Sequence, residues 1–83
     1  MTSASRQASI APVPRLRKRS ISLSGHATSL ALEPEFWETL SAMAQARRAS
    51  LAGLIIEIDA GREDRPLASA CRVAALKWAL TRG

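Results

Sequence analysis

Positive charge gathers at two places in this 83-residue sequence, and both could hold an anion. Ser50 is a good helix N-cap, and the backbone N–H groups at the start of such a helix bind phosphate readily. Arginines just before that start add charge-assisted hydrogen bonds. The other place is a basic cluster near the beginning of the chain. The residues that we expect to contact phosphate are Arg47, Arg48, Ser50 and Leu51, together with Arg17, Lys18 and Arg19. The alternative is an ordinary serine cap beside solvated arginines, with a solvated charged tail.

Residue types that catalyse reactions or bind metals do not form a pattern here. His26 is the only histidine, and no Ser/His/Asp set, phosphate loop or HExxH motif accompanies it. Cys71 is the only cysteine, so an internal disulfide and a cysteine-based zinc site are excluded, and we expect the thiol to pack as a small hydrophobe. The acids between 57 and 64 lack the spacing of oxygen ligands. We therefore expect no enzyme activity, no metal and no cofactor.

The charge is unevenly distributed along the chain. Residues 1–32 hold five Lys or Arg and no acid, residues 33–64 have a net charge of −4, and residues 65–83 return to +4. Basic segments outside an acidic centre suit a phosphate-rich partner such as nucleic acid, although a basic tail can also serve solubility alone. The sequence contains no apolar run long enough to cross a membrane. We expect a cytoplasmic protein.

Hydrophobic spacing predicts one short strand and three helices. Leu30 and Leu32 alternate with small residues, as in a half-buried strand. Helical spacing begins at Pro34, which suits a first helical position, and resumes after Ser50. Gly61 and the charged loop 62–66 end the second helix, and residues 67–80 form an alanine-rich third helix. In that third helix Leu67, Cys71, Ala74 and Trp78 recur along one line, which Val73, Leu76 and Leu80 widen.

The segment before the strand raises a question of register. Ile21 and Leu23 are apolar at odd positions, whereas Leu30 and Leu32 are apolar at even ones, so one continuous strand would divide them between two faces. A hairpin with Gly25-His26 as a type II′ turn would place Leu23 opposite Thr28 and Ile21 opposite Leu30, all on one face. The alternative keeps only residues 27–32 as a strand, with a bulge or break at Gly25.

Residues 1–18 are expected to be a disordered basic tail, and residues 19–83 a single small domain. Pro12 and Pro14 interrupt any helical or strand period in a segment rich in Ser and Ala. A domain of this size has barely enough core by itself, so oligomerisation often supplies more. A strand of about five residues also needs a mate, either elsewhere in the chain or in a second copy, and this requirement suggests a dimer.

The segment SLALEPEFWETLSAMAQARRASLAGLIIEI resembles the Arc/MetJ-type ribbon-helix-helix DNA-binding superfamily, and the likeness covers roughly residues 18–80. In particular, the chain is similar to short bacterial proteins that share a basic start, a GH-x-TS strand, an E-x-x-FW helix opening and a following S-L helix. Those elements are present here as Lys18-Arg19-Ser20, Gly25-His26 with Thr28-Ser29, Glu33–Trp37, and Ser50-Leu51. The implied fold is mainly α with a short β ribbon: a ribbon-helix-helix dimer with an added C-terminal helix.

The resemblance implies a homodimeric DNA-binding protein, most simply a small transcriptional regulator. Two copies would pair their strands, and alternate outward residues of the ribbon, here Ala27, Ser29 and Ala31, would enter the major groove. This sequence departs from the long polar side chains usual there, since serine bonds bases weakly and alanine can only touch a thymine methyl. The helix start at Ser50 would anchor DNA phosphate. The implied dimer core comprises Leu30, Leu32, Phe36, Leu40, Leu54, Ile55 and Ile58.

Two other functions compete with this interpretation. One is an antitoxin, a DNA-binding dimer whose third helix or basic tail holds a toxin. The other is a dimer that uses the fold for protein interaction alone, which the two alanines at predicted base-contact positions favour.

Overall fold

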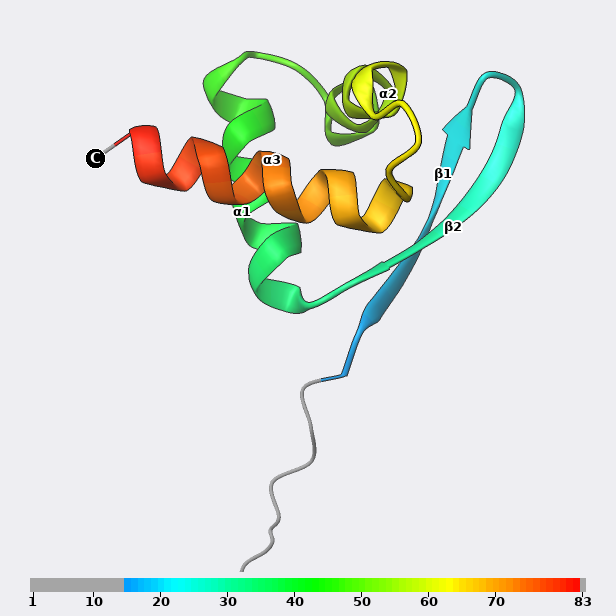
Figure 1. Cartoon of the computed structure of the whole chain (residues 1–83), viewed down its shortest axis with the longest axis horizontal. Coiled ribbons are helices and arrows are strands. Elements are labelled where there is room, and N and C mark those ends of the chain that lie inside the picture. The colour runs from blue at the N-terminus through cyan, green and yellow to red at the C-terminus, as the bar shows by residue number, and fades with distance from the viewer. Residues whose placement is uncertain (1–14, 83) are drawn as a thin grey trace, which may run out of the picture.

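The computed structural model describes residues 15–82, which form a β-hairpin followed by three helices (Figure 1). Strands β1 (Arg17–Leu23) and β2 (His26–Leu32) make a two-stranded antiparallel sheet. Helices α1 (Pro34–Ala46), α2 (Leu51–Gly61) and α3 (Leu67–Thr81) follow. The mainly α fold with a short ribbon and an added third helix is confirmed. None of the helices in this part of the chain is long and apolar enough to cross a membrane.

The hairpin is confirmed, but its predicted turn was wrong by one residue. Leu23 pairs with His26 and Ile21 with Thr28, so Ser24 and Gly25 form the turn instead of Gly25 and His26. Ser24 has φ +51° and Gly25 has φ +83°, and positive φ at both central residues defines a type I′ turn. This turn matches the twist of the flanking strands, and glycine at its second position carries no steric cost.

The predicted sharing of one apolar face is confirmed despite the shifted turn. When the turn moves by one residue, the partner of each β1 residue moves by two positions along β2. Side chains two residues apart are on the same face, so every side chain keeps its predicted face. Ile21, Leu23, Leu30 and Leu32 are all buried, with Leu32 fully so. β1 begins at Arg17, two residues before the predicted start of the folded domain at residue 19. Of the tail predicted to be disordered over residues 1–18, Arg17 and Lys18 belong to β1, and residues 1–14 lie outside the described residues.

A single chain encloses the core that we assigned to a dimer. Leu30, Leu32, Leu40, Leu54 and Ile55 are buried within one copy, and Phe36 and Ile58 pack against them half-buried. The physical reason is that β1 supplies the mate of β2 and α3 supplies a cover, both from the same chain. An unpaired strand is therefore no longer an argument for a dimer.

Helix α3 lies across α1, near the end of α2 (Figure 1), and Arg72 makes two contacts with the start of α1. Arg72 Nε donates to Glu33 Oε1 at 2.9 Å, and the Arg72 guanidinium lies 5.8 Å from the centre of the Phe36 ring. The hydrogen bond from Arg72 lowers the pKa of Glu33 below its ordinary value. Cys71 is completely buried, as predicted for a small hydrophobe, and burial raises the pKa of its thiol to about 11.

Only part of α3 faces inward, which corrects our prediction of one widened apolar line. Leu67, Cys71, Ala74 and Trp78 do pack toward the core. Leu76 and Leu80, however, are 55% and 73% exposed. The two groups lie on opposite sides of the helix because consecutive residues are 100° apart, and sequence alone did not reveal which side the core would use.

The turn can be tested by the substitution Ser24→Asn. Asparagine tolerates positive φ better than serine, and Asn-Gly is the preferred pair of a type I′ turn. We expect the free energy of unfolding in urea to rise by about 0.5 kcal/mol. His26→Asn is the control, because His26 lies in β2 and asparagine is disfavoured in strands. Stabilisation by His26→Asn and not by Ser24→Asn would restore the Gly25-His26 turn.

Candidate nucleic-acid interface

The outward face of the hairpin contains the three predicted base-contact residues. Ala27 and Ser29 are exposed and Ala31 is half-buried, all on the side opposite the core. Their partners across the sheet are residues of β1 that share this face. The pairs are Ser22 with Ala27, Ser20 with Ser29, and Lys18 with Ala31. This face, which we call the ribbon face, therefore presents three serine hydroxyls and one ammonium group together with two alanines.

The basic cluster is divided between the two faces of β1. Lys18 points outward with the ribbon face, whereas Arg17 and Arg19 alternate with it and lie on the core side of the sheet. There the Arg19 guanidinium is 5.1 Å from the centre of the Trp37 ring, and Trp37 Nε1 donates to the Arg17 carbonyl at 2.8 Å. Arg17 and Arg19 also line a cleft of about 440 Å³ against α1. The three basic residues thus do not form one contiguous phosphate site.

The connection between α1 and α2 has the hydrogen bonds of a Schellman helix end. Ala49 N–H donates to the Ala44 carbonyl at 2.8 Å, and Arg48 N–H donates to the Gln45 carbonyl at 3.0 Å. This geometry requires the intervening residue to be left-handed, and Arg48 has φ +57°. Glycine is the usual residue at this position because a side chain costs about 1 kcal/mol there. An exposed arginine thus occupies a left-handed position, as Glu63 does after α2, and its side chain is directed to solvent beside the start of α2.

The start of α2 has the predicted cap. Ser50 Oγ accepts a hydrogen bond from Gly53 N–H at 2.9 Å. A Cβ on Gly53 would lie 3.0 Å from that hydroxyl oxygen, so glycine leaves room for the cap. The N–H groups of Leu51 and Ala52 precede the first intrahelical bond and remain available to an anion. For Leu51 only this backbone group matters, because its side chain packs against the core.

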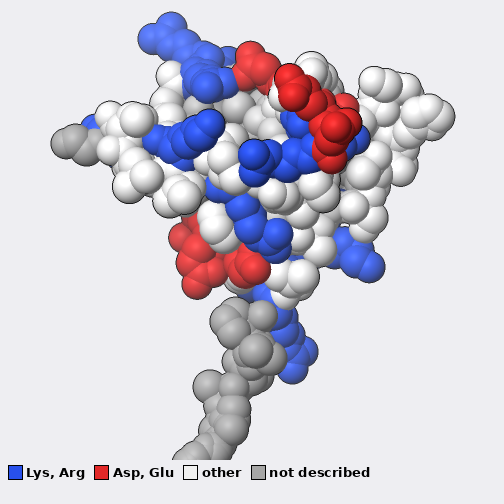
Figure 2. All heavy atoms as spheres, in the orientation of Figure 1, with Lys and Arg blue, Asp and Glu red and all other residues white. Residues whose placement is uncertain are grey.

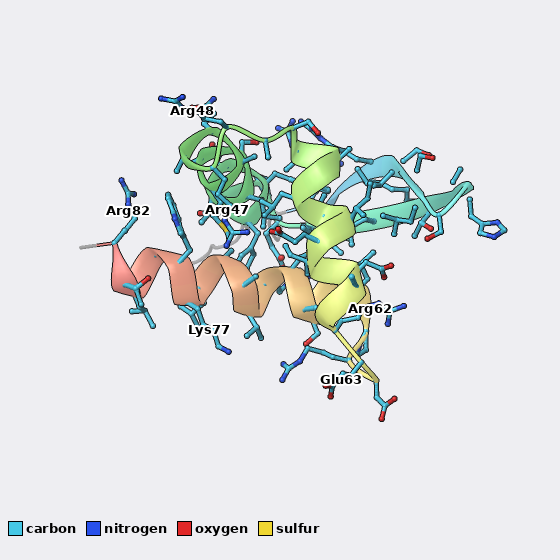
Figure 3. All side chains as sticks on the ribbon, turned by 90° about the horizontal axis from the view of Figure 1, so that it is seen from above. Arg47, Arg48, Arg62, Glu63, Lys77 and Arg82 are labelled. Carbon is cyan, nitrogen blue, oxygen red and sulfur yellow. The ribbon has the colours of Figure 1, made fainter. Side chains whose placement is uncertain are left out.

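Arg47 and Arg48 differ in their surroundings. Arg47, which precedes α2, forms an ion pair with Glu57 of that helix, and both side chains are at least half exposed. Arg48 has no ion pair among the residues that the structure describes. In Figure 3, Arg48 projects away from the helices, while Arg47 turns back over them. Arg48 is therefore the freer cation beside the Ser50 helix start, a distinction that the sequence did not reveal.

The two basic regions lie at opposite ends of α1. The open end of the hairpin precedes Pro34 and Arg48 follows Ala46, so the 13-residue helix separates them by about 20 Å. On the face drawn in Figure 2, Lys and Arg occur in several groups, from below the start of α1 to its far end, and acids gather near the start of α1 and around the end of α2. A single phosphate could not contact both basic regions, so a nucleic acid would have to bind them through two different phosphates. No group of three or more His, Cys, Asp or Glu in the described part of the chain is placed to hold a metal.

Comparison with known proteins identifies the architecture. A family model described as "Ribbon-helix-helix domain" matches residues 16–79. The chain belongs to the ribbon-helix-helix family. Members of this family typically bind DNA, dimerise and are not enzymes. No curated protein and no solved structure shows a significant match to this chain. The match spans both strands of the ribbon, which one chain completes by itself, and all but the last two residues of α3.

The strain at Arg48 gives a stability prediction. Arg48→Gly should raise the free energy of unfolding by about 1 kcal/mol, because glycine adopts positive φ without a Cβ clash. Arg47→Gly is the matched control: Arg47 has φ −94°, so glycine there gains nothing, loosens the unfolded chain and removes the ion pair. Urea unfolding of both variants measures the difference. A destabilised Arg48→Gly variant would contradict the left-handed conformation.

Proposed function

We propose that this ribbon-helix-helix protein is a small DNA-binding transcriptional regulator that acts as a homodimer in the bacterial cytoplasm. The observation that carries the proposal is the capped start of α2, where free N–H groups stand beside an exposed, strained Arg48. A helix start of this kind binds phosphate through the backbone, so it tolerates variation of side chains elsewhere. The ribbon face, with Lys18 and the serines, would lie in the major groove.

The chemistry of the ribbon face predicts weak direct readout. A serine hydroxyl both donates and accepts, so it fits either base type, and an alanine can only contact a thymine methyl. Most of the affinity would then come from phosphates and would fall steeply with salt. Semi-specific binding with a strong salt dependence is the behaviour that this composition supports.

A second copy would have to join a ribbon that is already complete. In a two-stranded sheet each strand has one paired edge, and its other edge is open to a further strand. We infer that in a homodimer the ribbons of the two copies join edge to edge, because each copy already has both strands of its own ribbon.

The phosphate assignment is tested by Arg48→Gly in DNA-binding measurements. This variant is expected to be more stable than the wild type, so weaker binding cannot result from unfolding. We expect the log–log slope of affinity against salt to fall by about 0.9 for each phosphate that the protein no longer neutralises. Fluorescence anisotropy with a labelled random-sequence duplex over a salt series measures this slope.

The control for that experiment is Arg65→Ala. It removes the same charge from the loop after α2, beyond the opposite end of that helix. Affinity and slope should match the wild type. If Arg48→Gly binds every duplex as the wild type does, the phosphate site is not at the start of α2. If the wild type itself binds no duplex, the interaction-only alternative replaces DNA binding.

The homodimer is tested by light scattering of the wild type across a range of concentrations. We expect twice the mass of one chain, with hydrogen exchange at one edge of the ribbon slowing as the protein associates. A folded monomer at every concentration would remove the dimer while leaving the phosphate assignment open to its own test.

An antitoxin remains the second candidate, because one face of α3 is apolar and exposed. A reading frame of toxin size beside the gene would favour it.

A further inference from the structure

Helix α3 is apolar on two opposite sides, and the protein covers only one of them. The inner side packs into the core, where Cys71 and Ala75 are almost completely buried. On the outer side Leu76 is 55% exposed and Leu80 is 73% exposed, and Val73 is half-buried beside them. An apolar strip that remains exposed beside charged residues is typical of a surface that binds a partner. The outer side therefore has the composition of an interface.

The outer apolar residues have the spacing of a coiled-coil seam. Val73, Leu76 and Leu80 are three and four residues apart, which is the alternation of a and d positions in a heptad. We call these three residues the outer seam. Arg72 and Lys77 occupy the flanking g and e positions, which set the choice of partner in such pairs. α3 contains no acid in its 15 residues.

The charge beside the outer seam differs between its two flanks. Arg72 donates a hydrogen bond to Glu33, the N-cap residue of α1, and lies over the ring of Phe36 in the first turn of that helix. Lys77 has no ion pair among the described residues, and in Figure 3 it points away from the other two helices. A groove of about 430 Å³ between α3 and the end of α2 adjoins this flank, with Val73 and Lys77 in its wall. Its wall also contains Arg62 and Arg65 together with Glu57 and Glu63, so three cations face two acids and this open flank has a net positive charge.

Electrostatics argue against a second copy on the outer seam. Two parallel α3 helices would place Arg72 opposite Lys77, and two antiparallel ones would place like residues together, so the flanking pairs repel in either orientation. A helix with acids at its e and g positions would instead pair with these cations. We propose that the outer seam docks an amphipathic helix of another protein, with leucine-like residues along its contact line and Glu or Asp beside them.

The outer seam does not depend on DNA binding, and it can be tested without DNA. The probe is a fluorescent synthetic peptide of about 21 residues, three heptads, with Leu at a and d and Glu at e and g. A companion peptide has Lys at e and g. Anisotropy titrations of the full chain should show saturable binding of the acidic peptide and none of the basic one.

Three variants separate the seam from the rest of the surface. Leu76→Gln with Leu80→Gln should weaken the acidic peptide at least about tenfold, since two leucines lose their cover. Lys77→Glu should shift the preference toward the basic peptide. Leu16→Gln is the matched control: Leu16 is 51% exposed but precedes β1, so binding should not change. All changed side chains are exposed, and circular dichroism checks that each variant folds.

Four results would overturn the proposal. Two of them come from the peptide titrations: no binding of the acidic peptide to the wild type, or equal binding of both peptides. Light scattering would assign the seam to a second copy if the Leu76/Leu80 variant alone failed to dimerise. Binding to vesicles of anionic lipid that the same variant abolished, without peptide binding, would assign the seam to a membrane surface.

Discussion

The structure depends on the burial of one face of the hairpin. Two strands alone are marginally stable in water, so this ribbon persists only because its apolar face packs against the helices. Ile21 and Leu23 from β1 meet Leu30 and Leu32 from β2 on that face, and Trp37 of α1 bonds back to the Arg17 carbonyl. Because side chains alternate along each strand, the same burial dictates which residues face outward. The composition of the ribbon face thus follows from the core.

This constraint explains which parts of the fold could be predicted from the sequence. Ile21 and Leu23 are at odd positions and Leu30 and Leu32 at even ones, a pattern that favoured a hairpin over one continuous strand. Both the predicted and the observed pairing place these four residues on one face. The turn itself could not be fixed, because Ser24-Gly25 and Gly25-His26 each offer a glycine at a usable position, and only the positive φ of Ser24 distinguishes them. Helix limits were predictable where a cap or a proline marks them, as at Pro34 and Ser50.

The position of the candidate site could be predicted from the sequence, but the surroundings of its individual side chains could not. Backbone features carry its chemistry, so the Ser50 cap and the Arg47-Arg48 pair indicated a phosphate site before any geometry was known. Which of the two arginines is free depends on Glu57, ten residues after Arg47, and no local pattern reveals that pairing. The basic cluster of β1 was likewise predicted as one group, although strand alternation divides it between two faces. In both cases the environment of each basic side chain depends on its position in the folded structure, which its residue type does not reveal.

Helix α3 shows why a single-chain core changes the argument about assembly. In a fold whose ribbon is shared, exposed apolar surface is most simply explained by the second copy. Here the ribbon is complete and α3 already closes the core, so its outer seam needs a separate explanation. A helix serving only as a cover could be polar on its outer side, where Val73, Leu76 and Leu80 stand instead. Cations beside the seam oppose self-pairing and favour an acidic partner. Helix α3 therefore has two sides with different roles: its inner side closes the core of this protein, and its outer seam is the surface that we propose for a different protein.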